Sequence, residues 1–441
     1  MASASSTPSL ESSGKPTKVR WYVFVAVLVL CTINYFDRAV ISLCMPVMEK
    51  DLHFGPEVIG IILSSFFWGY TLAQIPVGWI CDRVRAGTLL VSSGILWGIF
   101  QIFTGFISSA RVLMFLRALL GISEAPMYPA GSKLQSIWLP STERGRGAAL
   151  LAAGSDVGIA LGGPLVVLFL AWLGGWRGAL IAAGVLTIVV VLVCYRIMNS
   201  DPNTSPRVNQ AERDYIRNAL VQEYEASQKE RLASGTAAGS AVAYLKNHNF
   251  WAMCMGFCCA DALYYGLMTW GPLYLSHTQH LNIKSVGGSI FIIYAVAVAG
   301  ALSGGYFTDK WRLSGVRLNT VMHGGLAIAG AVIALSMYLL RAVTTAYIAI
   351  VLLSIAMFFL KWSFCLYWQS PAVIAQRKDV GTVAGTMNFI GNLAGVVTPI
   401  CVGLIVGATG SYFWVLLMFV AFGLGNCLFP WFVNYEKKIG A

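Results

Sequence analysis

The stretch WYVFVAVLVLCTINYFDRAVISLCMP, residues 21–46, decides the fold of this chain. A helix that crosses a lipid bilayer needs about 20 predominantly apolar residues, and this stretch provides them. It nevertheless carries Asp37 and Arg38 near its middle, where a charged side chain costs about 2.5–3.5 kcal/mol to insert. The stretch therefore predicts a membrane-spanning helix whose charged side chains face protein and serve a function.

Similar apolar stretches recur along the whole chain. Of the 441 residues, 57% are hydrophobic and 11% are charged, whereas soluble domains carry about 25% charged residues. Charged or Gly- and Pro-containing breaks separate the further predicted spans, which lie near 58–80, 88–108, 112–137, 147–170, 178–198, 248–275, 285–307, 318–340, 344–371, 382–406 and 411–433. The expected fold class is therefore an all-α membrane protein with twelve transmembrane helices.

The spans form two groups of six around one polar stretch. We expect a disordered tail at 1–20, an N-terminal six-helix bundle at 21–198, a linker at 199–247, a C-terminal six-helix bundle at 248–434 and a tail at 435–441. Within the linker, residues 209–217 have the pattern of a short amphipathic helix at the membrane surface.

The positive residues indicate an orientation. Most of them lie in the tails, the linker and the loops on one side, while the loops on the other side hold only Lys50, Arg111, Arg177, Lys284 and Arg341. Since cytoplasmic loops carry an excess of Lys and Arg, both termini are expected in the cytoplasm and the protein in the inner (plasma) membrane. The same rule explains the net charge of +11, so nucleic acid is not an expected partner.

A short motif occurs at the same place in both halves. Gly78-x-x-x-Asp82-Arg83 follows the second span, and Gly305-x-x-x-Asp309-Lys310 follows the eighth. Their equivalent positions predict two pseudo-symmetric bundles with a binding site between them at mid-depth. We expect these charges to form part of a gate on the cytoplasmic side.

Seven charged residues are expected near the middle of the membrane. Four of them, two acids and two bases, belong to the first half: Asp37, Arg38, Arg117 and Glu124. If one acid takes a proton, an arginine loses its partner and can bind an anion, so that proton and anion binding favour each other. Arginine suits this role because it stays charged and binds carboxylates in bidentate fashion. The alternative is a set of inert buried ion pairs.

The other three charges are Asp156, Asp261 and Lys361. Asp156 is expected to be neutral or to pair with Arg38 or Arg117. Asp261 and Lys361 are expected to pair with each other across the wall of the site, and Lys361 to bind a second carboxylate or a hydroxyl of the substrate. A purely structural pair is an equally open alternative. Lys133, near a span end, is expected to extend its amine to water.

Longer motifs resemble the anion:cation symporter family of the major facilitator superfamily. They are Asn34-Tyr35-Phe36-Asp37-Arg38, Tyr70-x-x-x-Gln74-Ile75-Pro76-x-Gly78, Arg117 to Pro129, Thr269-Trp270-x-Pro272-x-Tyr274-Leu275 and Gly385 to Gly395. The resemblance covers both halves. It implies alternating-access uptake of an organic anion with protons, and its bacterial members carry galactonate, glucarate or hexuronates.

The resemblance also implies roles for individual residues. Asp37 and Glu124 would be the proton sites, with Arg38 and Arg117 as their charge partners. Substrate contacts would come from Tyr35 and Tyr70 in the first half and from Trp368 and Asn388 in the second. Two positions depart from the sugar-acid carriers: Ser155, beside Asp156, replaces an amide, and Cys365 replaces a small hydroxyl residue.

Other functions remain open or are disfavoured. The carrier could import another carboxylate, for example an aromatic one, or export drugs against protons, since Gly154 to Pro164 approximates the glycine–proline signature of such antiporters. A passive channel would need rings of like residues. An enzyme would need a nucleophile–base pair or metal ligands, and the sequence suggests neither. We expect a monomer without cofactor or metal, driven by the proton gradient.

Overall fold

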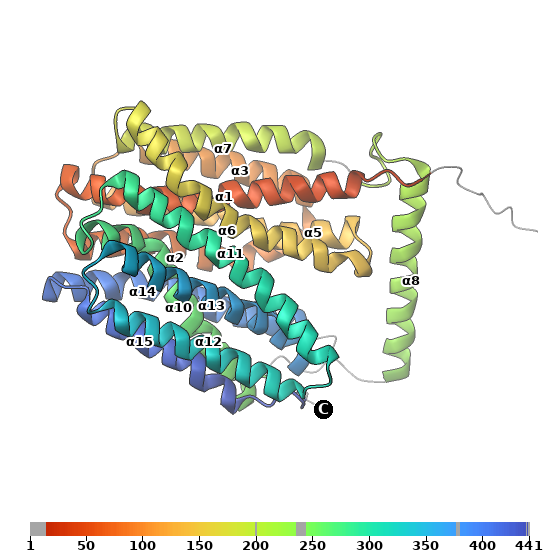
Figure 1. Ribbon diagram of the computed structural model, residues 1–441. Coiled ribbons are helices and arrows are strands. Elements are labelled where there is room, and N and C mark those ends of the chain that lie inside the picture. The colour runs from red at the N-terminus through yellow and green to blue at the C-terminus, as the bar shows by residue number, and fades with distance from the viewer. Residues whose placement is uncertain (1–14, 199–200, 235–243, 376–379, 438, 440–441) are drawn as a thin grey trace, which may run out of the picture.

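The computed structural model of the protein describes residues 15–198, 201–234, 244–375, 380–437 and 439. Within these residues the chain is helical and contains no strand (Figure 1). The first half comprises α1 (Val19–Leu52), α2 (Pro56–Arg83), α3 (Ala86–Thr104), α4 (Ala110–Glu124), α5 (Met127–Trp138), α6 (Ser141–Trp172) and α7 (Trp176–Met198). After α8 (Gln210–Ser234), the second half comprises α10 (His248–His277), α11 (Ile283–Leu313), α12 (Leu318–Leu340), α13 (Ala346–Ile374), α14 (Val380–Thr409), α15 (Phe413–Leu428) and η1 (Phe429–Phe432).

Eleven helices of the described residues are long and apolar enough to cross a membrane. The expected fold class is confirmed, but the predicted fourth span, 112–137, is not one helix. It is divided into α4 and α5 at Ala125 and Pro126. Proline has no N–H for the helical ladder and clashes with the preceding turn, so it ends α4, while it is tolerated at the start of α5.

Glycines allow close helix packing at equivalent places in the two halves. A Cβ atom at Gly69 of α2 would collide with the backbone of Ala118 in α4, and one at Gly300 of α11 would collide with the backbone of Phe358 in α13. Small residues let helix backbones approach in this way where lipid provides no hydrophobic driving force between helices. The two halves are therefore built on the same helix–helix contact.

The halves meet at the end of the molecule opposite α8. There Gly60 of α2 packs against Gly403 of α14, and Gly163 of α6 packs against Gly287 of α11. A polar contact joins α1 to α10 at the same end, since the Nε2 atom of His277 lies 2.8 Å from the Oε2 atom of Glu49. This contact could not be predicted from the sequence, because the two residues belong to different halves of the chain.

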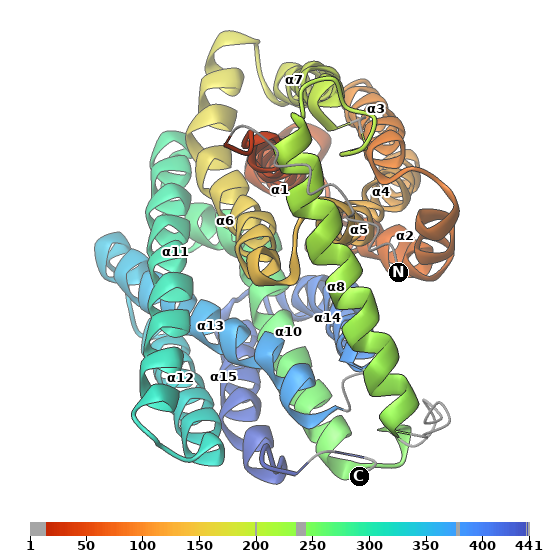
Figure 2. The ribbon, with the colours of Figure 1, turned by 90° about the vertical axis from the view of Figure 1, so that its right-hand side faces the viewer.

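Helix α8 is longer than the predicted short helix: it has 25 residues and runs across one end of the molecule, over helix ends of both halves (Figure 1; Figure 2). Arg20 of α1 holds its first turn. The Arg20 Nη1 atom lies 2.8 Å from Glu212 of α8, and the Nε atom lies 2.7 Å from Glu143 of α6. The ring of Tyr215 lies 4.9 Å from the same guanidinium.

The C-terminal segment also packs on the helices. Tyr435 is buried, and its backbone N–H donates to the side chain of Asn319. The backbone N–H of Ile439 donates to the carbonyl oxygen of Ile374 at 2.8 Å. The predicted tail at 435–441 is thus attached to α12 and α13 as far as it is described.

Replacing Arg20 by alanine should release α8, because Glu143 and Glu212 then lose their shared cation. We expect faster amide hydrogen exchange across 210–234, with little change for Lys18→Ala, which removes an exposed neighbouring cation. The hydrogen bond from Arg20 lowers the pKa of Glu143 below its ordinary 4.5. A lowered pKa in the folded state contributes stability that is present above pH 4.5 and lost as the pH falls further. Protection of α8 should therefore also decline below pH 4.5, and unchanged exchange in Arg20→Ala would contradict this anchor.

Candidate functional site

A buried ion pair lies between α1 and α4. The Nε atom of Arg38 lies 2.7 Å from the Oε2 atom of Glu124, and their side chains are 1% and 0% exposed. Two helices of the first half therefore present one acid and one base to each other away from water. Such a pair is weak evidence for stability, because desolvation offsets much of the attraction, so a functional reason for it must be considered.

Aromatic rings surround the Arg38 guanidinium. Its Cζ atom lies 4.5 Å from the ring centre of Tyr35, 4.5 Å from that of Tyr70 and 4.8 Å from that of Phe66. The Nη1 and Nη2 atoms are buried and have no hydrogen-bond partner among the described residues. Arg38 thus donates one hydrogen bond, from Nε to Glu124. Cation–π contacts position the two terminal nitrogens of the guanidinium, which remain free to donate to a ligand.

The other two charges of the first half are arranged differently from the expectation. Arg117 lies against Phe66, with its Cζ atom 5.0 Å from the ring centre, and forms no ion pair among the described residues. Asp37 accepts a hydrogen bond of 2.5 Å from the hydroxyl of Thr187 in α7. The expected pairing of arginine with Glu124 is observed, whereas Asp37 has a threonine partner that the sequence did not reveal.

The charges of the second half correct the predicted pairing. The Nζ atom of Lys361 in α13 lies 2.6 Å from the Oδ1 atom of Asp156 in α6, so it pairs across the two halves and not with Asp261. Asp156 likewise pairs with neither Arg38 nor Arg117. The reason is the rotation of α6: Gly154 and Gly158 face α1, and Asp156, two residues from each, points away from that helix.

Asp261 is buried and forms no ion pair in the part of the chain that the structure describes. Its carboxylate lies beside Gly391 of α14, where a Cβ atom would collide with it. Four residues further along α10, Tyr265 donates a hydrogen bond of 2.9 Å to the Oδ1 atom of Asn392. The Nδ2 atom of Asn392 in turn donates to Asn388, so these amides connect α10 to α14.

The remaining predicted contact residues have separate surroundings. The hydroxyl of Ser155 donates to the carbonyl of Ala152 in its own helix at 2.7 Å. Trp368 is 50% exposed, and its ring meets the ring of Phe257 edge-on at 5.8 Å. Tyr35 accepts a hydrogen bond of 3.2 Å from the hydroxyl of Tyr128, a residue of α5 that directly follows the break in the fourth span.

The structure describes part of the predicted gate. Arg83 packs on the ring of Trp79 at 3.7 Å, and the Nζ atom of Lys310 lies 6.0 Å from the ring of Tyr306. Gly78 lies in α2. Gly305 lies in α11. The side chains of Asp82 and Asp309 lie outside the described set, so the gate remains a prediction.

Lys133 differs from its prediction. Its Nζ atom donates to the carbonyl oxygens of Cys81 and Val84, the latter at 3.1 Å, instead of extending to water. It therefore donates to carbonyl groups at the C-terminal end of α2, directly beside the motif.

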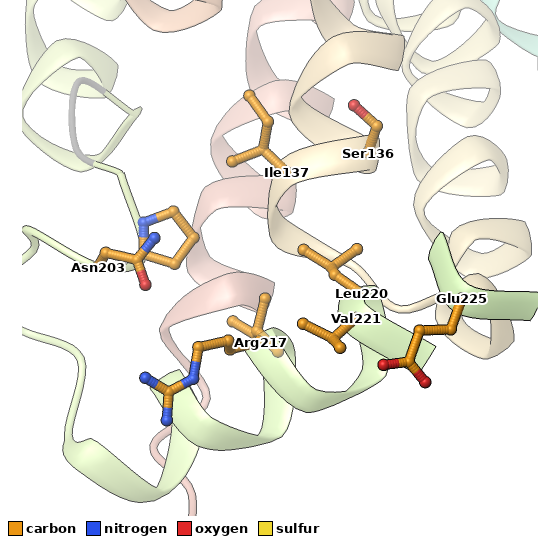
Figure 3. A pocket seen from close by; sticks show the side chains of 9 residues that line it. Ser136, Ile137, Asn203, Arg217, Leu220, Val221 and Glu225 are labelled. Carbon is orange, nitrogen blue, oxygen red and sulfur yellow. The ribbon is translucent and has the colours of Figure 1, made fainter. Parts of the chain in front are cut away.

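A surface pocket lies elsewhere, between α5 and α8 (Figure 3). It has a volume of about 560 Å³, and its lining includes Ser136, Arg217, Leu220 and Glu225. None of the predicted site residues lines it. The described residues also contain no cluster of His, Cys, Asp or Glu that could hold a metal ion. The buried charges at the helix interfaces are therefore the candidate functional site.

Comparison with known proteins bears on the family and the fold. The sequence profile of the Major Facilitator Superfamily matches residues 27–399. The chain is 30% identical to the probable galactarate/D-glucarate transporter GudP of Bacillus subtilis over 92% of this chain and 89% of that protein. It is 26% identical to the D-galactonate transporter of Escherichia coli O6:H1 over 89% of this chain and 90% of that protein.

A solved structure has the same fold. The crystal structure of a bacterial homolog to the human lysosomal transporter Spinster, in an inward-facing and occupied conformation, superimposes with a TM-score of 0.71 at 17% identity, covering 95% of each chain. Fold, profile and relatives therefore agree on a membrane transporter and not an enzyme. The chain belongs to the Major Facilitator Superfamily.

Proposed function

We propose that this protein is a proton-coupled symporter that takes up an organic anion by alternating access, and that the anion is a sugar acid such as an aldonate, aldarate or hexuronate. The observation that carries the proposal is Arg38. It is buried among aromatic rings, is paired through one nitrogen with Glu124, and has two nitrogens without partners among the described residues.

The substrate class is supported by that arginine and by the relatives. A buried guanidinium with unsatisfied donors favours a carboxylate, because charge-assisted bidentate bonds are among the strongest that a protein can form. Tyr35 and Tyr70 flank the guanidinium and can donate hydroxyl hydrogen bonds to the same ligand. Several relatives bear the names of galactarate, glucarate or galactonate transporters, and all of these substrates are polyhydroxylated carboxylates.

The proposed coupling follows from the Arg38–Glu124 pair. When Glu124 takes a proton, its attraction for Arg38 falls, and the full guanidinium fork becomes available to the substrate. When substrate leaves, Arg38 returns to Glu124, and the carboxyl group releases its proton because the ionised form is again paired. Each ligand thus raises the affinity of the other, as linkage requires. Asp37 is proposed as the second proton site, and Arg117 as a nearby cation that favours anion entry.

The remaining parts of the proposal concern the second half and the membrane. Trp368 and Asn388 are proposed substrate contacts, and the motif from Gly78 to Arg83 with its repeat from Gly305 to Lys310 is proposed as a gate. The carrier would work as a monomer in the inner membrane with both termini in the cytoplasm and without a cofactor.

The experiment is uptake into proteoliposomes from a panel of labelled acids. It should include aldonates, aldarates, hexuronates and aromatic acids, each with and without an inward proton gradient. We expect gradient-stimulated uptake of at least one sugar acid and of no aromatic acid. Uptake confined to aromatic acids would overturn the substrate class, and accumulation only under an outward proton gradient would indicate an antiporter.

A further inference from the structure

The ion pair between Asp156 and Lys361 has no place in the coupling scheme above. It joins α6 of the first half to α13 of the second at 2.6 Å, and the two side chains are 7% and 10% exposed. Alternating access moves one half against the other around a central site. A buried charge pair that joins the halves must therefore be broken or shielded during each transport cycle, or it would hold the halves together.

Groups that could bind a polar ligand surround this pair. Lys361 lies 4.1 Å from the ring centre of Tyr264 in α10. The hydroxyl groups of Tyr264 and Tyr294, the latter in α11, are buried and have no hydrogen-bond partner among the described residues. Both hydroxyls lie within electrostatic range of the Asp156 carboxylate. A buried phenol without a partner is costly, which is a reason to expect a ligand beside it.

Aromatic rings connect Lys361 to Arg38. Tyr264 adjoins Tyr265 with ring centres 5.5 Å apart, and Tyr265 meets Phe67 of the first half at 4.6 Å. Phe67 in turn meets Phe66 at 5.2 Å, and Phe66 lies 4.8 Å from the Arg38 guanidinium. One continuous set of rings thus carries a cation at each end, one from each half of the molecule.

We propose, on the basis of the proposed function, that Lys361 is the second carboxylate site and that the carrier selects dicarboxylates over monocarboxylates. One carboxylate of the substrate binds Arg38. The other replaces Asp156 as the ionic partner of the Lys361 ammonium group, and the Tyr264 and Tyr294 hydroxyls bind substrate oxygens. An aldarate fits this pattern, because it carries a carboxylate at each end of a hydroxylated chain.

The exchange at Lys361 has a consequence for protons. Asp156, once displaced, would be a buried carboxylate without a cation, so it takes a proton from the side on which substrate enters. The titratable groups that interact electrostatically with Asp156 besides Lys361 are Cys31 of α1, Tyr264 of α10 and Tyr294 of α11, none of them cationic, and the further acid near Lys361 is Asp261. Asp156 is then a further proton site beside Glu124 and Asp37, and its proton balances the second negative charge of the substrate.

The test compares glucarate with gluconate, two six-carbon acids that differ in one terminal carboxylate. In Lys361→Met the ratio of kcat/KM for glucarate to that for gluconate should fall about tenfold or more, as expected for a lost charged hydrogen bond. Lys361→Arg should retain most of the ratio, and Lys284→Met, which removes an exposed lysine, should leave it unchanged. Asp156→Asn should keep the preference for glucarate but transport one proton fewer with it.

The double variant Asp156→Asn with Lys361→Met separates binding from folding, because it leaves no lone buried charge. We expect it to be stable in detergent, to be stabilised less by glucarate than the parent protein, and to retain the low ratio. A parental ratio in this variant or in Lys361→Met would overturn the dicarboxylate site alone. If the parent protein transports no sugar acid of the panel described above, the proposed function fails as well, and the two failures are thus distinguishable.

Discussion

Replacement of Arg38 by alanine is expected to lower organic acid uptake at least about 100-fold. The substitution removes two hydrogen-bond donors, the Nη1 and Nη2 groups, which are buried beside Tyr35 and Tyr70 and have no protein partner among the described residues. Each hydrogen bond to a charged group contributes about 1.5–3 kcal/mol, and every 1.4 kcal/mol is a factor of ten in affinity. Arg38→Lys should also lose most activity, because an ammonium group keeps the charge but cannot form the fork. The measurement is initial uptake in proteoliposomes at matched protein content.

Two neighbouring arginines supply the control. Arg117 and Arg111 both belong to α4, but Arg117 is buried near Phe66 and Arg111 is exposed. Arg117→Ala should impair uptake strongly, and Arg111→Ala should not. Because Arg38→Ala leaves Glu124 unpaired, it should also be measured together with Glu124→Gln, which restores neutrality. Activity near the parental level in this neutral double variant would contradict a role for Arg38 in substrate binding.

Glu124→Gln is expected to abolish accumulation against a gradient while exchange of internal for external substrate continues. The amide resembles the protonated carboxyl group, so Arg38 stays available to substrate but no proton is carried by this residue. With the membrane potential clamped, one coupled proton and one pH unit of gradient support about tenfold accumulation. The parent protein should reach or exceed that ratio, and Glu124→Gln should approach equal concentrations on both sides.

Exchange and accumulation must be measured on the same vesicles, so that a variant that loses accumulation but retains exchange can be recognised. Asp37→Asn is expected to abolish accumulation as well, since Asp37 is the second proposed proton site and is bound to Thr187. Thr187→Val is the matched variant: it removes the hydroxyl but leaves both carboxyl groups, and it should retain coupling. A Glu124→Gln carrier that still accumulates substrate would exclude Glu124 as a coupling residue.

Much of the fold was predictable because lipid imposes a strict length and composition on each span. Residues 21–46 and their counterparts were recognisable for that reason. The break at Pro126 was also encoded, but the apolar run continues through it and hid the boundary between α4 and α5. The length of α8 was underestimated because its second half is polar and lacks an apolar stripe that would mark a helix.

The site was predictable within one helix and less so between helices. The cost of burying charge identified Arg38 and Glu124, and the structure places them in contact. The same argument could not identify the partner of Lys361, because the choice of partner depends on the rotation of α6 and on how the two halves pack together. Spacing along a chain determines which residues share a helix face, whereas contacts across an interface depend on tertiary packing.

Proton movement caused by substrate alone is the most direct test of proton-coupled symport. Proteoliposomes with a pH indicator in the lumen and equal pH on both sides would receive external glucarate or galactonate. We predict that the lumen acidifies as substrate enters the parent protein, and that Glu124→Gln shows no acidification with galactonate, whose single carboxylate does not displace Asp156. Substrate entry without acidification, or with a rise in luminal pH, would contradict the account.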